Sequence, residues 1–185
     1  MAKEIELKAH VSHSDYCRKL IEKKFGFSGS SLLKSDRYFG FNQTPGSLSE
    51  RALLRIRVEQ NRYVATRKEK RLHGDGMEEN REIEFSGPAE DYHNVTDFFV
   101  SLGYSIIAAK DKRGWYWKVA VPQPMTIELV EVGSLGWFLE VEIILRDDAA
   151  DHEVSEARNT IQQLMKSVGI ADVDIEKRYY LDMLG

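Results

Sequence analysis

Several strand-like segments of this sequence carry charged residues at every second position, with apolar residues between them. Glu4, Glu6 and Lys8 alternate with apolar residues in the first segment, and Glu140 and Glu142 do so in a late one. Successive side chains of a strand point to opposite faces, so each segment has one charged face and one apolar face. A sheet made of such strands must bury its apolar face and turn its charges the other way.

The charges on these segments are segregated by sign. The further sets at alternate positions are Arg55 with Arg57, Thr66 with Lys68, and Glu82 with Glu84. Any one such pair is usually a solvated sheet face, but like charges grouped strand by strand require an external counter-charge. If the sheet closes into a barrel with the charged faces inward, the acids form a cation site and the bases an anion site in one cavity. A metal-chelated polyphosphate satisfies both groups.

The periodicity predicts an α+β fold with about eight mostly antiparallel strands interrupted by helices. The chain has 185 residues and is predicted to form a single domain over residues 1–185. The expected strands are 3–11, 32–41, a hairpin within 52–70 that turns near Gln60 and Asn61, 77–87, 104–121, 125–132 and 136–146. The expected helices begin near residues 14, 89, 152 and 172, and residues 42–50 are expected to form a polar loop.

Composition and motifs exclude several other functions. The net charge of −4 indicates neither a nucleic-acid partner nor a membrane partner, and no apolar run is long enough to span a bilayer. The single Cys17 excludes an intramolecular disulfide and fits a packing role in a cytoplasmic protein. The histidines lack a zinc-ligand spacing. Trp115, Trp117 and Trp137 are expected to pack strands against helices, the alternative being that they line a tunnel mouth.

The segment Glu4–Lys8 resembles the ExExK signature of the CYTH superfamily. These triphosphate tunnel metalloenzymes include class IV adenylyl cyclases, thiamine triphosphatases and inorganic triphosphatases. The resemblance continues in chain order through Asp36 and Tyr38, Arg55 and Arg57, Thr66 and Lys68, Arg81 to Glu84, Lys110 to Arg113, Leu135 to Glu142, and Tyr180 with Leu184. Where relatives carry an aspartate, the gapless match is Val130, with Glu128 two positions earlier on the same strand face.

The resemblance implies a closed eight-stranded antiparallel β-barrel that forms a tunnel, with helices packed outside. It also implies roles for individual residues. Glu4, Glu6 and Lys8 are the expected catalytic residues; Glu4, Glu6, Glu128, Glu140 and Glu142 the ligands of Mg²⁺ or Mn²⁺; Lys8, Arg55, Arg57, Lys68, Arg81 and Arg113 the substrate-binding residues; and Glu82 and Glu84 supporting residues that orient the bases or bind metal.

The function that the resemblance implies is divalent-metal-dependent hydrolysis of a triphosphate, namely tripolyphosphate, thiamine triphosphate or a nucleoside triphosphate. One alternative is a class IV adenylyl cyclase that converts ATP to cyclic AMP and pyrophosphate. The His-Phe pair that such cyclases tend to carry upstream of ExExK is missing before Glu4. Another alternative is a non-catalytic polyphosphate- or nucleotide-binding module, and a homodimer is also compatible with the resemblance.

Overall fold

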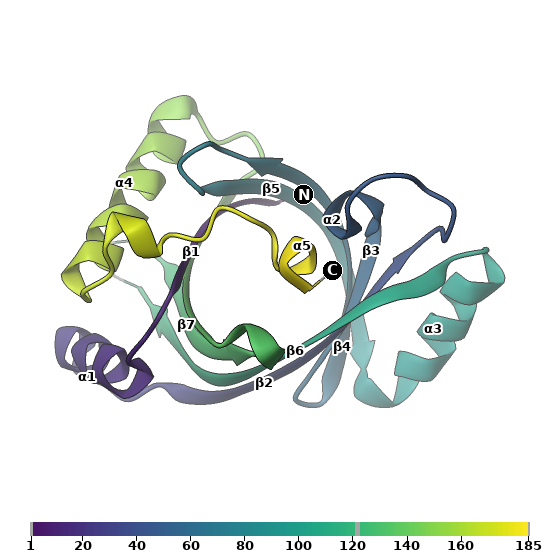
Figure 1. Ribbon diagram of the computed structural model, residues 1–185, viewed down its shortest axis with the longest axis horizontal. Coiled ribbons are helices and arrows are strands. Elements are labelled where there is room, and N and C mark those ends of the chain that lie inside the picture. Colours follow the sequence, from purple (N-terminus) through teal and green to yellow (C-terminus); the bar gives the residue numbers. More distant parts are fainter. Residues whose placement is uncertain (1, 121–122, 185) are drawn as a thin grey trace. The chain divides into compact units, whose positions relative to one another are not determined.

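The computed structural model describes residues 2–120 and 123–184, and its strands form a closed antiparallel barrel (Figure 1). The hydrogen-bonded order of the strands is β1-β5-β4-β3-β2-β6-β7-β8. The strands are β1 (Ala2–His10), β2 (Ser30–Gly40), β3 (Leu54–Glu59), β4 (Arg62–Leu72), β5 (Glu78–Pro88), β6 (Ser105–Val119), β7 (Met125–Val132) and β8 (Trp137–Arg146). The predicted fold class is therefore confirmed. Residue 121, the end of one expected strand, lies outside the described residues.

The chain divides into two compact units, each with its own core. The first comprises Met1–Leu32, Glu69–Arg81 and Arg113–Lys177, and the second comprises Leu33–Lys68, Glu82–Lys112 and Arg178–Gly185. Strands β2, β4, β5 and β6 each pass from one unit into the other along the chain. The prediction of a single domain remains a prediction.

In the first unit, α1 (Ser14–Phe25) and α4 (Asp151–Ser167) pack on the apolar face of β1, β7 and β8. Ile5 of β1 contributes to this core together with Ile21 of α1 and Ile161 of α4, and each is fully buried. The alternation seen in the sequence thus places the apolar face of β1 under helices and its charged face on the other side.

The tryptophans and the cysteine of the first unit serve packing, as predicted. Trp117 is buried in the core, and Trp115 stacks on Trp137 with ring centroids 5.6 Å apart. Arg18 of α1 lies over the Trp115 ring. Burial raises the pKa of the Cys17 thiol to about 11, so this side chain is a neutral packing group at physiological pH.

Gly114 of β6 shows why one strand position requires glycine. Its φ is +156°, and a Cβ atom there would lie 2.1 Å from the carbonyl oxygen of Leu129 on β7. No side chain fits at that distance from a backbone atom. The close approach of β6 and β7 therefore depends on this glycine.

In the second unit, α3 (Tyr92–Ser101) packs on the apolar face of β2, β3 and β4. Phe39 and Ile56 are fully buried there, and the ring of Phe99 meets that of Phe39 edge to face, with centroids 5.4 Å apart. Asp36 and Tyr38 alternate with the residues of this core, so they lie on the face of β2 that α3 does not cover.

Two predictions about local structure were wrong. The expected loop 42–50 contains the start of a short helix, α2 (Leu48–Arg51), which a capping box formed by Ser47 and Glu50 stabilises. The expected final helix is interrupted: Asp172–Asp174 forms a 3-10 turn, and only α5 (Tyr180–Leu184) is helical beyond it. Between them the chain is extended and pairs with β1, where the backbone N–H of Glu176 donates to the carbonyl of Lys8.

Helix α5 packs within the second unit on residues that α3 does not reach. Leu181 is buried with Tyr38 and Ala52, and the carboxylate of Asp182 accepts hydrogen bonds from the backbone N–H and the hydroxyl of Ser49. The last helix is therefore tied to α2 and lies against the residue Tyr38 of β2. Among the described residues, no helix combines the length and apolarity that crossing a bilayer requires.

Candidate metal and phosphate site

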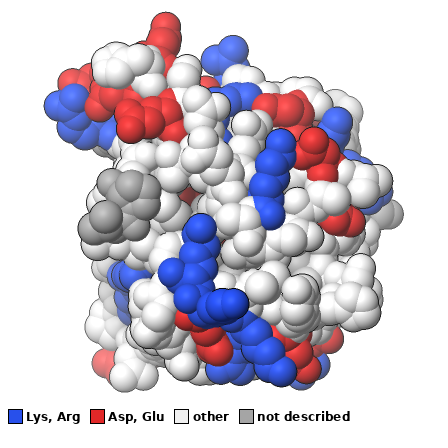
Figure 2. Space-filling view, turned by 90° about the vertical axis from the view of Figure 1, so that its left-hand side faces the viewer, with Lys and Arg blue, Asp and Glu red and all other residues white. Residues whose placement is uncertain are grey.

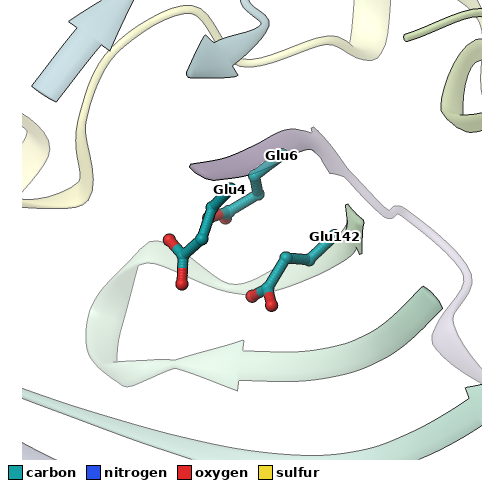
Figure 3. Close-up of side chains that lie close together, drawn as sticks. All are labelled: Glu4, Glu6 and Glu142. Carbon is teal, nitrogen blue, oxygen red and sulfur yellow. The ribbon is translucent and has the colours of Figure 1, made fainter. Parts of the chain in front are cut away.

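Three glutamates of the first unit form a carboxylate cluster. Glu4 and Glu6 of β1 and Glu142 of β8 each offer an oxygen atom, and these atoms lie within 4.8 Å of one another. Figure 3 shows the three side chains extending from the two strands into the same space. The strand register explains this arrangement, because Glu6 and Glu142 are directly opposite each other. All three side chains are half-buried.

The other two predicted metal ligands lie in the next row of the sheet, on β8 and β7. Glu140 of β8 is opposite Lys8 of β1 on one side and opposite Glu128 of β7 on the other. Glu128 and Glu140 are buried, with 8% and 6% of their surfaces exposed. Glu128 thus shares a face with Glu140, as the alternation predicts, but the three-carboxylate cluster does not include either of them.

Lys8 forms a buried ion pair with Glu78 of β5. The ammonium group of Lys8 donates a hydrogen bond to Glu78 Oε1, and the two side chains are 1% and 8% exposed. The amide of Asn80, which is fully buried, donates to Glu78 Oε2 at 3.4 Å. The lysine that was predicted to bind phosphate is therefore engaged by a carboxylate in this structure, and its phosphate-binding role remains a prediction.

In the second unit, Asp36 of β2 contacts two bases, the predicted phosphate-binding residue Arg57 and Lys110. The register places Asp36 opposite Arg57, whose Nε and Nη2 donate to the two carboxylate oxygens at 2.7 and 3.0 Å. Lys110 Nζ lies 3.4 Å from Asp36 Oδ2, and the hydroxyl of Tyr38 donates to the same oxygen at 3.2 Å. One buried carboxylate therefore contacts two cations.

Two further bases of this unit, Arg55 and Lys68, contact the predicted supporting glutamates. Arg55 Nη2 donates to the hydroxyl of Thr66, which in turn donates to Glu84 Oε1 at 2.7 Å. Lys68 Nζ lies 2.7 Å from Glu82 Oε1. Of the two functions considered for Glu82 and Glu84, these contacts favour orientation of the bases over metal binding.

Two predicted substrate-binding arginines lie in exposed ion pairs instead. Arg81 is paired with Asp147 at 3.2 Å and Arg113 with Glu131 at 2.5 Å, and the two arginine side chains are 51% and 74% exposed. Both ion pairs join residues of the first unit. Strand alternation separates Arg113 from Lys112, which is buried.

The structure adds Glu78, Asp36, Lys110 and Lys112 to the residues of functional interest. A signal for Glu78 was present in the sequence, because the alternation of Glu82 and Glu84 continues backward along the strand to it. The other three lie within the motifs that resemble the family, but sequence alone did not assign a role to them. That Asp36 and Lys110 are buried is known only from the tertiary structure.

The carboxyl group of Asp36 stays ionised at pH values far below 7, because its pKa is lowered. Burial by itself would raise the pKa of this carboxyl, but the nearby charges of Arg57 and Lys110 outweigh burial and hold the pKa well below its usual range. A carboxyl whose pKa is lower in the folded state than in the unfolded state stabilises the fold above the unfolded pKa of about 4, and this stability is lost as the pH falls through the folded pKa.

We therefore expect Asp36→Asn to be less stable than the wild type at neutral pH, with the difference in the free energy of unfolding shrinking below a pH of about 4. Urea unfolding at a series of pH values measures both proteins. A difference that stays constant down to a pH of about 2 contradicts the assignment of Asp36 as a paired carboxylate.

On the face drawn in Figure 2, acidic and basic side chains lie next to each other in small groups separated by uncharged surface. This mixed distribution fits the small net charge of −4.

Comparison with known proteins gives consistent results. The CYTH domain family model matches residues 2–180. A conserved hypothetical protein from Pyrococcus furiosus is 25% identical, with a TM-score of 0.71, over 97% of this chain and 98% of that chain. A Pyrococcus horikoshii protein is 23% identical, with a TM-score of 0.76, over 98% and 97% of the two chains. An adenylyl cyclase candidate from Hippeastrum, described as revealing a dominant triphosphatase activity, is 15% identical, with a TM-score of 0.64, over 100% and 94%. No curated protein matches the sequence.

Proposed function

Because the chain belongs to the CYTH domain family, we propose that it is a divalent-metal-dependent hydrolase of triphosphate substrates. The observation that carries this proposal is the cluster of Glu4, Glu6 and Glu142, whose oxygen atoms lie within 4.8 Å of one another. Carboxylate oxygens that lie this close together are the ligands that a hard divalent cation prefers. A binding module that only held phosphate would need the bases but not this cluster.

The donor set fits Mg²⁺ or Mn²⁺. Both are hard cations that prefer carboxylate oxygens, and Mg²⁺ commonly combines a few carboxylates with water and substrate phosphate oxygens. Glu4, Glu6 and Glu142 are the residues proposed to hold the ion, with Glu140 and Glu128 in the adjacent row as further candidates. When bound, the ion would neutralise phosphate charge and lower the pKa of a coordinated water.

The protein's own contribution is to bind and orient the phosphates. Arg57, Arg55, Lys68 and Lys110 are the proposed phosphate-binding residues, and Asp36, Glu82 and Glu84 hold them in defined positions. Phosphoryl transfer depends mainly on such positioning and on neutralisation of the transferred group. Hydrolysis of the terminal anhydride bond consumes one water and releases orthophosphate and the diphosphate.

The second candidate is an adenylyl cyclase, in which the ribose 3′-hydroxyl attacks the α-phosphorus and pyrophosphate leaves. It is kept because the Hippeastrum neighbour is described both as an adenylyl cyclase candidate and by its triphosphatase activity. Hydrolysis is preferred because the residues proposed here, the bases beside Asp36, Glu82 and Glu84, are of the kind that binds phosphate, and the proposal assigns none of them to a nucleoside. The two reactions differ in their products, so one assay separates them.

The test is a panel of tripolyphosphate, thiamine triphosphate and ATP with Mg²⁺ or Mn²⁺, analysed for orthophosphate, pyrophosphate and cyclic AMP. We expect orthophosphate from at least one substrate, and a rise in melting temperature when metal and tripolyphosphate are present, because ligands that bind the native state stabilise it. Cyclic AMP with pyrophosphate would establish the cyclase. A rise in melting temperature without any product would establish the non-catalytic binding module.

A further inference from the structure

We propose that Asp36 is a positioning residue that holds Arg57 and Lys110 in the geometry that binds phosphate, an inference that rests on the proposed function. Asp36 is fully buried and accepts two hydrogen bonds from the guanidinium of Arg57, at 2.7 and 3.0 Å. Its Oδ2 is also 3.4 Å from Lys110 Nζ. Nothing in this geometry brings Asp36 to substrate, so it acts through the two cations.

The contact with Asp36 sets the orientation in which the guanidinium of Arg57 can bind a phosphate. A guanidinium is planar and carries five N–H donors, so two parallel hydrogen bonds to a carboxylate set the orientation of its plane. Asp36 engages Nε and Nη2 of Arg57, and the side chain of Arg57 is 14% exposed. The orientation is therefore set by a buried partner before any substrate binds, which lowers the entropy cost of binding.

Lys110 needs Asp36 for a related reason. Its side chain is 6% exposed, and its ammonium lies 4.6 Å from the ring centroid of Tyr180 and 5.6 Å from that of Tyr38. The hydroxyl of Tyr38 donates to Asp36, so the carboxylate fixes both the cation and one of the rings beside it. A buried ammonium stays charged only when a counter-charge is close. Asp36 supplies that charge.

The affinity of Asp36→Asn for a polyphosphate distinguishes a positioning role of Asp36 from an effect of its charge alone, because the two explanations predict changes of opposite sign. Replacing Asp36 by asparagine removes one negative charge next to two bases, so if only net charge mattered, the variant would bind a polyphosphate more tightly. If Asp36 positions the bases, the variant binds more weakly, because Arg57 and Lys110 lose their common partner and repel each other. The proposal predicts weaker binding.

The experiment is a double-mutant cycle on binding of tripolyphosphate, measured by calorimetry without metal. We expect Asp36→Asn and Arg57→Ala each to weaken binding about tenfold. We expect the loss of affinity in the double variant to be smaller than the two single losses combined, because part of the effect of Asp36 acts through Arg57 and residues that act through one another are not additive. Asp111→Asn is the matched control: it changes an exposed aspartate of the same unit that contacts Arg37, and its affinity should equal that of the wild type.

Additive losses, tighter binding by Asp36→Asn, or no binding of tripolyphosphate by the wild type each overturn the proposal. Asp36→Glu gives an independent measurement if the asparagine variant does not fold. It keeps the charge but displaces it by one methylene, so positioning predicts weakened binding and neutralisation alone predicts wild-type affinity. A wild type that binds tripolyphosphate but releases no orthophosphate with Mg²⁺ or Mn²⁺ refutes the hydrolase and leaves this inference intact.

Discussion

Glu142→Gln is expected to lower metal-dependent hydrolysis of tripolyphosphate by about two to three orders of magnitude, as is typical when an active site loses one group that helps to stabilise developing charge. Glutamine keeps the size of the side chain but removes its charge, which weakens a hard cation site. Glu142 shares the cluster with Glu4 and Glu6, so the loss falls on the residues proposed to hold the ion.

In the metal-free protein, the same substitution removes one of two like charges that lie in opposite positions of neighbouring strands. Glu142 is directly opposite Glu6, and like charges in opposite positions of neighbouring strands destabilise a sheet by roughly 0.2–1 kcal/mol. Removing one of them relieves that repulsion. The stabilisation by Mg²⁺ or Mn²⁺, in contrast, should be reduced or absent.

Turnover and melting with and without metal are measured together, and Glu22→Gln serves as the control. Glu22 pairs with Arg18 on helix α1, so its loss should leave turnover unchanged. A Glu142→Gln enzyme with wild-type turnover would remove the cluster from the reaction. A large fall in metal-free stability would instead indicate a structural carboxylate.

The largest effect on stability is expected from Glu78→Ala. This substitution takes the hydrogen-bonded carboxylate away from the ammonium of Lys8, which is 1% exposed. Breaking one side of a buried ion pair costs about 3 kcal/mol or more. For a chain of this size that corresponds to a fall in melting temperature of roughly 6–12 °C.

Glu79→Ala is the matched control for this prediction, because Glu79 is the adjacent residue of the same strand and is paired with Lys3 and His73. Its side chain is 19% exposed, and we expect a loss of at most about 1 kcal/mol. Replacing both partners, as Lys8→Met with Glu78→Leu, should be less harmful than Glu78→Ala alone. Equal melting temperatures for Glu78→Ala and Glu79→Ala contradict the buried pair.

Several elements were predictable because local periodicity determines them. The alternation in β1 predicted both a strand and its buried face, and Ile5 and Leu7 are buried as expected. The hairpin at Gln60 and Asn61 was predicted correctly, with β3 ending at Glu59 and β4 beginning at Arg62. Helix propensity predicted the last segment of the chain less well. There Ile175 pairs with Ala9 of β1, and this pairing interrupts the expected helix.

The types of residue in the candidate site could be predicted from the sequence, but the residues that each of them contacts could not. The pairing of Glu6 with Glu142 depends on the register of β1 and β8, which are far apart in sequence. The same limit applies to Lys8, whose partner Glu78 is 70 residues away. A single sequence shows which face a side chain occupies, but it does not show which residue lies opposite.

The sequence by itself determined the eight alternating strands, the face on which each charge lies, and the segregation of acids from bases, because a strand's side chains alternate with a period of two. Only the tertiary structure decided which charges meet: Glu4, Glu6 and Glu142 in one cluster, Lys8 buried against Glu78, and Asp36 between Arg57 and Lys110. Strand register and burial determine these contacts, and both depend on residues distant in the chain.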